Sequence, residues 1–355
     1  MSTGEQPVGE TDNSDEDNGL SPFIARILGQ LSLSAWLPAG LLTLALTLLI
    51  QFRGQHVIDL SDAVNALTKD KGTLLILTLP VLITVTLITQ AFSFEAIRTL
   101  EGYWYRPGPG TLARSALTRW HLRRKNRLHA KRLKASHKAF LAARDEWLAA
   151  FSSAVVNGLE RYCLEQDLTA SEKAAFSDRD WAILESLEWS NKCAPWHMAK
   201  IDHYTMAEQD YPDDNRIMPT RLGNIIRAAE DTLQNTDGDV QGFALRRRTY
   251  APPRIRQQHD QFRTRLDMYS ILVFVAGFLT AATPALLIGA VHDDDKVWIA
   301  WMTVGFGVLA WASYQAAIAS AAGYVTALRQ MDLYSTGEVG PAATPKPIAN
   351  EESQS

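Results

Sequence analysis

Charged side chains are absent from four long stretches of this 355-residue sequence, although Asp, Glu, Lys and Arg make up 21% of the chain. The stretches also lack histidine, and they are Leu31–Phe52, Thr73–Phe94, Tyr269–Val291 and Trp298–Gly323. A helix needs about 20 apolar residues to cross a ~30 Å hydrocarbon layer, and a helix satisfies its own backbone there. The sequence therefore predicts an all-α membrane protein with four transmembrane helices in a 2+2 arrangement.

Those absences also narrow the function. Proton relays and charged transport pathways use ionisable groups inside the spans, so their absence disfavours a secondary transporter. The sequence contains no G-x-x-x-x-G-K-[ST], G-x-G-x-x-G, H-E-x-x-H or G-x-S-x-G motif, so we predict neither an enzyme nor a bound cofactor. Two cysteines, Cys163 and Cys193, are too few for a disulfide framework and indicate a reducing compartment.

Basic residues are missing from the first 20 positions, which carry six acidic groups. A secretory signal peptide begins with positive charge, so we expect the first span to remain as an anchor. Residues 1–21 are predicted to be a disordered acidic tail, and residues 329–355 a mostly disordered C-terminal tail.

The distribution of Lys and Arg predicts the orientation. Gly102–Arg144 contains twelve basic residues and no acidic one, whereas the 51–72 loop contains three basic residues. Basic residues favour the cytoplasmic side, so both termini and a helical domain at 96–267 are predicted to be cytosolic. A transmembrane hairpin at 22–95, with spans at about 31–52 and 73–94, precedes that domain. A second at 268–328, with spans at about 269–291 and 298–323, follows it.

Local patterns predict helices inside the insertion. One long helix is expected at 111–165, with Phe140, Trp147, Phe151, Val155, Leu159 and Tyr162 on one side. Thr169 and Ser177 each begin a capping-box pattern. Residues 190–218 are expected to be irregular, and a helix is expected to begin at Pro219. At most a short extended piece is expected around 243–250. A short helix after Asp59 is also predicted.

Basic residues in the first half of the long helix suggest contact with anionic headgroups of the inner leaflet. The predicted lipid contacts are Arg123, Arg124, Lys125, Arg127, Lys131 and Arg132. Ordinary positive-inside bias is the alternative for residues near the spans. Nucleic acid is not expected, because aromatic residues for base stacking are sparse along this run.

Cys193, His197 and His203 form a loose set of zinc-type ligands. Their C-x3-H-x5-H spacing lacks the usual paired pattern, so we predict no metal site and retain these three residues only as weak candidates.

Two short sequence blocks have features that an amphipathic helix does not require. The first, at 94–104, places Glu95, Arg98 and Glu101 on helical neighbours; the second, at 219–224, contains Arg221, Gly223 and Asn224. Glycine inside a helix costs about 1 kcal/mol relative to alanine, which suggests close approach of a second helix or a ligand near the backbone. A simply tolerated glycine is the alternative. Both blocks resemble segments of uncharacterised bacterial membrane proteins, chiefly actinobacterial. The resemblance covers a small part of the chain and implies no activity.

These observations predict a multi-pass protein of the bacterial inner (plasma) membrane with a cytosolic sensing or interaction domain. A homo-oligomeric channel or pore is the alternative, and a membrane enzyme acting on lipid is a second alternative. The expected partners are membrane lipids, a cytosolic protein or further copies of this chain.

Overall fold

The computed structural model describes residues 33–55, 58–59, 71–104, 109–233, 240–292 and 295–336. Every regular element in these ranges is helical, and none of them contains a strand. Four helices are long and apolar enough to cross a membrane: α2 (Leu33–Gln55), α4 (Lys71–Glu101), α12 (Pro253–Leu287) and α13 (Lys296–Thr336). This confirms the predicted all-α class and the four candidate spans. The predicted helix after Asp59 and the N-terminal tail lie outside the described residues.

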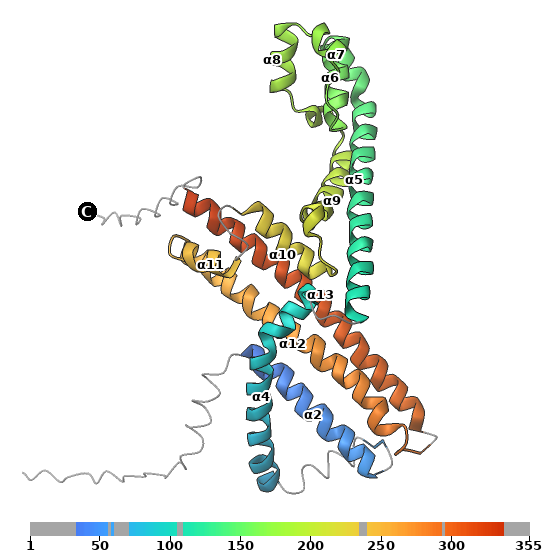
Figure 1. The fold of residues 1–355 in the computed structure, drawn as a ribbon, viewed down its shortest axis with the longest axis vertical. Coiled ribbons are helices and arrows are strands. Elements are labelled where there is room, and N and C mark those ends of the chain that lie inside the picture. The colour runs from blue at the N-terminus through green and yellow to red at the C-terminus, as the bar shows by residue number, and fades with distance from the viewer. Residues whose placement is uncertain are drawn as a thin grey trace, which may run out of the picture.

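The four apolar helices form one end of the molecule (Figure 1). α12 and α13 run side by side, and α2 and α4 pack against α12. α2, α12 and α13 share a core that contains Leu49 and Phe52 of α2, Leu279 and Leu287 of α12, and Ile299 of α13.

Two of these helices extend well beyond their apolar stretches. α12 begins at Pro253, before Tyr269, and α13 continues to Thr336. The start of a disordered tail at residue 329 is therefore wrong: Leu328 and Met331 are fully buried, and Leu328 packs with Phe243. Phe243 lies on α11 (Val240–Arg248), so the predicted extended piece at 243–250 is also wrong. The apolar burial against α13 favours a helix there.

The remaining helices include an outer unit, defined here as α5 to α9. α5 (Pro109–Ala150) has 42 residues and rises away from the four-helix end (Figure 1). α6 (Ser153–Cys163), α7 (Ala170–Ala175) and α8 (Asp178–Ser186) gather at its far end. The short 3-10 helix η1 (Trp189–Lys192) precedes α9 (Pro195–Gln209), which packs along α5. A second 3-10 helix, η2 (Asp214–Arg216), leads to α10 (Arg221–Thr232).

The predicted single helix at 111–165 breaks after Ala150. Ser152 caps α6, its hydroxyl accepting a hydrogen bond from the Val155 amide at 3.3 Å. The change of direction still buries Phe140, Trp147, Val155 and Leu159 in one core, but it leaves Tyr162 exposed. Both predicted capping boxes, at Thr169 and Ser177, are confirmed.

Residues 190–218 are not irregular throughout, because α9 occupies much of that range. Pro195 takes the first helical turn, where a missing amide costs nothing, and Ile201 packs on Ala135 and Ala139 of α5. The helix predicted from Pro219 instead starts at Arg221. Thr220 is its N-cap and accepts a hydrogen bond from the Gly223 amide at 3.1 Å.

Candidate functional site

The two sequence blocks meet in space, although more than 100 residues separate them. The last turn of α4 and the first turn of α10 form what we call the junction. The Thr220 hydroxyl donates a hydrogen bond of 2.9 Å to the Glu101 carbonyl oxygen. A Cβ atom added at Gly223 would collide with that same carbonyl oxygen. The junction is thus a contact between two main chains, for which glycine leaves room.

The backbone conformation on each side of the junction depends on one particular residue. Gly102 has a φ of +97°, a conformation that side-chain-bearing residues rarely adopt, and it lies against the Pro219 ring. Asn224 is fully buried and organises the chain before α10. Its side chain accepts a hydrogen bond from the Met218 amide at 2.8 Å, and it donates to the Met218 and Thr220 carbonyls at 3.0 and 2.7 Å.

Basic side chains at the junction contact aromatic rings and acids of the same protein. Arg98 lies 5.4 Å from the centre of the Tyr103 ring, and Arg227 lies 5.3 Å from it. Arg227 also donates to the Tyr103 hydroxyl at 2.5 Å and to Glu230 at 2.6 Å. Glu95, Arg98 and Glu101, which the sequence placed together, therefore have different roles. Arg98 stacks on aromatic rings, the Glu101 carbonyl accepts the hydrogen bond from Thr220, and Glu95 lies farther along α4.

The apolar face of α10 binds it to three other helices. Leu222, Ile225 and Ala229 share a buried cluster with Ile97 of α4 and with residues of α12 and α13. The members from α12 and α13 are Leu266, Ala317, Ile318, Ala321 and Val325. α10 is therefore held to the four-helix end by packing as well as by the junction.

A connecting segment, residues 210–220, runs from α9 to α10 and also contacts α5. Lys125 of α5 donates to the Pro212 carbonyl at 2.8 Å and pairs with Asp214 at 2.7 Å. Arg216 pairs with Glu230 at 2.5 Å and also with Asp231, both on α10. The segment thus has ion pairs to both α5 and α10, so a displacement of either helix acts on the other through it.

His121 anchors the same segment at a buried position. Its Nδ1 lies 3.2 Å from the Tyr211 hydroxyl, and Trp120 packs edge-on to its ring. Burial, and then the positive charges of Arg124 and Arg221, lower the pKa of His121 from 6.5 to about 4. The imidazole is neutral at pH 7. Burial also raises the pKa of Tyr211.

The predicted lipid-contact residues divide into different environments. Lys125 pairs with Asp214, and Arg132 pairs with Glu165 at 2.7 Å and with Glu208 at 2.6 Å. Hydrogen bonding to Glu165 raises the pKa of Arg132 and lowers that of Glu165. Arg124 stacks on Trp120, Lys131 lines a cavity, and Arg123 and Arg127 are exposed.

The weak metal candidates have other contacts. The Cys193 thiol lies 3.7 Å from the Ala139 carbonyl oxygen, and burial raises its pKa. The ring centres of His197 and Trp196 are 5.7 Å apart, and those of His203 and Tyr204 are 5.5 Å apart. In the described ranges, no group of three His, Cys, Asp or Glu side chains has the arrangement of a metal site.

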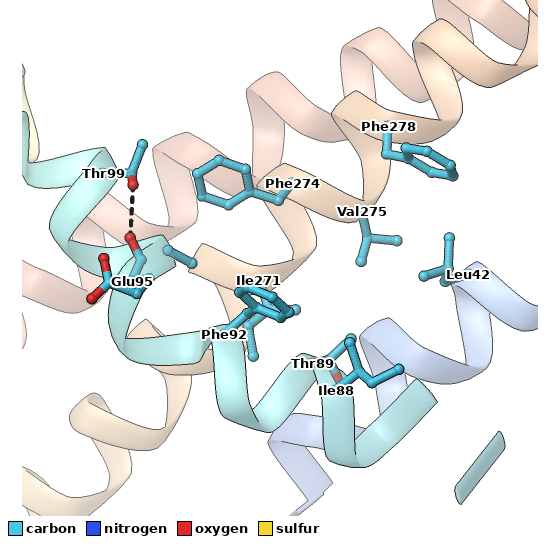
Figure 2. Close-up of a pocket in the computed structure, with 11 residues that line it drawn as sticks. Leu42, Ile88, Thr89, Phe92, Glu95, Thr99, Ile271, Phe274, Val275 and Phe278 are labelled. Atoms are coloured by element: carbon cyan, nitrogen blue, oxygen red, sulfur yellow. Dashed lines mark hydrogen bonds between the residues drawn. The ribbon is translucent and has the colours of Figure 1, made fainter. Parts of the chain in front are cut away.

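An apolar cavity of about 320 Å³ lies between α2, α4 and α12 (Figure 2). Phe92 of α4 and Phe274 and Phe278 of α12 line it, with Leu42 on the α2 side. Glu95 and Thr99 border one end, where the Thr99 hydroxyl donates to the Glu95 carbonyl at 2.7 Å. The cavity has the size and apolar character to hold part of an acyl chain.

Sequence reasoning missed the connecting segment and the second half of the basic face of α5. The spacing of Lys131, Lys134 and Lys138 places them on one helix face, a signal visible in the sequence. Nothing local indicated that Lys200 of α9 would lie opposite them.

The chain matches no protein-family model, no curated protein and no solved structure.

Proposed function

We propose that the chain is a multi-pass inner-membrane protein whose helical domain at 96–267 faces the cytosol and binds a partner there. Binding of the partner changes the position of the membrane spans. The observation that carries this proposal is the junction, where α10 approaches the main chain of α4. α4 is one continuous helix of 31 residues from its apolar part to Glu101. A shift of α10 therefore acts directly on a candidate span.

The outer unit suits a binding role. α5 is 42 residues long, which corresponds to roughly 60 Å at about 1.5 Å per residue. It holds α6, α7 and α8 at its far end, away from the four-helix end, and α9 packs along its side (Figure 1). A partner bound to α5 or α9 would alter the connecting segment, whose ion pairs reach α10.

Anionic lipid headgroups are proposed as a second class of partner, at the beginning of α12. A cavity of about 750 Å³ there is bordered by Arg256 and Arg265 and by Tyr269, which begins an apolar stretch. Basic residues close to an inner leaflet attract anionic lipid by about 1 kcal/mol each. The ion pairs of Lys125 and Arg132 make those two residues less suitable for the same role.

Reporter fusions test the architecture. Fusions after Gly110 and at the C-terminus are expected to be cytoplasmic, and fusions within 54–72 or at Asp294 external. An external reporter anywhere in the 110–266 region would overturn the proposal.

Hydrogen exchange on the purified full-length protein tests the coupling. Gly223→Leu separates the junction, so amides of α10, the connecting segment and the last turns of α4 should exchange faster together. Faster exchange confined to α10 would contradict transmission to α4.

A further inference from the structure

A basic cavity of about 460 Å³ lies between α5 and α9, apart from the junction. Four lysines border it together with two aromatic side chains, a histidine and an alanine. Its lining is Lys131, Lys134, Ala135 and Lys138 of α5, and Trp196, His197, Lys200 and Tyr204 of α9. The lysines of α5 are spaced three and four residues apart, so one helix face presents all three.

Three other basic side chains of this part of α5 have acidic partners. His129 lies 2.9 Å from Glu208, His137 lies 2.9 Å from Glu160, and Arg132 pairs with Glu165 and Glu208. Within the described residues, no ion pair joins any of the four lysines of the cavity to a carboxylate. Positive charges gathered without counterions in a concave surface create a field that attracts anions.

The aromatic residues add a second kind of contact. Trp196 is 72% exposed, although its ring is one of the largest apolar surfaces in the outer unit. It lies at the cavity, one residue from His197 and one helical turn from Lys200. An exposed indole beside lysines suits a ligand with both phosphate groups and a planar ring, because such a ring stacks on the indole face.

We propose that this cavity binds a soluble nucleotide carrying two or more phosphate groups, with the lysines holding the phosphates and Trp196 stacking on the base. The volume is suitable for a small molecule and too small for a nucleic-acid strand. This inference rests on the proposed function only in that the cavity must face the compartment that contains soluble nucleotides.

The position of the cavity favours a soluble ligand over a lipid headgroup with the same phosphate chemistry. Lys131 lies roughly 33 Å along α5 from Pro109, at about 1.5 Å per residue. α5 rises away from the four apolar helices, and α9 packs along it (Figure 1). α9 leads directly into the connecting segment, so a nucleotide that draws α5 and α9 together also acts on the route to α10.

The test uses the full-length protein in nanodiscs of zwitterionic lipid, with ATP as the probe and calorimetry as the readout. The parent protein should bind ATP saturably, with one site per chain. Lys134→Gln combined with Lys138→Gln should weaken binding about tenfold or more, since each lysine lost removes a charge-assisted hydrogen bond to a phosphate. Arg123→Gln with Arg127→Gln is the matched control, because it removes the same charge from exposed positions on the same helix.

Two further arms separate the parts of the ligand. Trp196→Ala should weaken ATP binding while leaving the affinity for inorganic tripolyphosphate unchanged. Nanodiscs containing phosphatidylglycerol should compete little with ATP.

Four results would overturn the proposal. These are no saturable ATP binding, equal losses in the paired-lysine variant and its control, no effect of Trp196→Ala, or displacement of ATP by phosphatidylglycerol. The last result would assign the cavity to a headgroup. Reporter fusions remain informative in every case, so failure of the nucleotide assignment is distinct from failure of the proposed topology.

Discussion

Polar and charged groups have partners within the protein at the junction, whereas the lysines of the basic cavity have no acidic partner among the described residues. At the junction, Asn224 makes three hydrogen bonds with the backbone, and Arg227 contacts both Tyr103 and Glu230. At the basic cavity, three lysines of α5 and one of α9 border a space of about 460 Å³. The first arrangement stabilises the fold, whereas the second adds repulsion to it.

That difference separates structural residues from candidate binding residues. A buried polar group that has all its partners contributes to one defined conformation, and its loss leaves other groups unsatisfied. Like charges without partners do not improve folding, so the four lysines are candidates for contact with a ligand. Substitutions at the two places should therefore affect stability by very different amounts.

The largest effect is expected at Gly223. Gly223→Leu must separate two backbones, so the free energy of unfolding should fall by about 3 kcal/mol, the upper end of overpacking costs. Gly223→Ala should also destabilise, because a single Cβ already meets the Glu101 carbonyl. Thermal unfolding in detergent is the measurement. Gly110→Ala is the control, since no atom lies within 4 Å of a Cβ there; an equal loss in this variant would rule out the close approach.

Asn224→Ala should rank second. It removes three hydrogen bonds at a fully buried position and leaves the Met218 amide without its acceptor. A loss of about 2 kcal/mol follows from the cost of an unsatisfied buried group. Asn191→Ala, at an exposed position of the outer unit, is the control for loss of an amide. Equal melting temperatures for Asn224→Ala and the parent would contradict the ordering role of Asn224.

Acid should weaken the connecting segment through His121. The folded-state pKa of about 4 lies below the ordinary 6.5, so the unfolded chain takes up a proton first as the pH falls. The stabilising contribution is complete above pH 6.5 and is lost between about pH 6.5 and pH 4. Arg124 and Arg221 face the ring along with Tyr211, and solvent screens the two guanidinium charges, so we expect a loss of about 1–2 kcal/mol.

His121→Phe provides the comparison for that pH effect, because it keeps a ring beside Trp120 and cannot take up a proton. The melting temperature of the parent should fall relative to that of the variant as the pH is lowered from 7 to 4. Parallel pH profiles would show that His121 does not contribute to the acid sensitivity.

The smallest effect on stability is expected at the basic cavity. Lys134→Gln with Lys138→Gln should change the free energy of unfolding by no more than about 0.5 kcal/mol, and in the stabilising direction, because like charges are removed. Denaturant unfolding at low salt is the measurement. A loss comparable to that of Asn224→Ala would mean that the lysines have structural partners and would remove the contrast with the junction.

Local signals explain which parts of the fold were predictable. The four apolar stretches and the capping boxes at Thr169 and Ser177 depend on residues close together in sequence, and all were recognised. Gly223 attracted attention because a glycine beside an apolar helix face has a local cost. Its partner, the Glu101 carbonyl, is a main-chain atom and has no signature in the sequence.

Features set by tertiary contacts were not predictable in this way. α11 is helical because Phe243 finds a buried place against α13, which no neighbouring residue indicates. Lys125 and Lys131 look equivalent in the sequence, because both lie in the same run of basic residues. The structure places Asp214 beside Lys125, and Lys200 across a cavity from Lys131. The prediction that six basic residues act alike therefore missed their division into different environments.

The use of a carbonyl oxygen at the junction has a consequence for how this sequence can diverge. Every amino acid supplies that oxygen, so position 101 can change its side chain during evolution without losing the hydrogen bond from Thr220. Position 223 has no such freedom, because any side chain begins with a Cβ. Related chains that keep this architecture should therefore retain glycine at 223, whichever side chain they carry at 101.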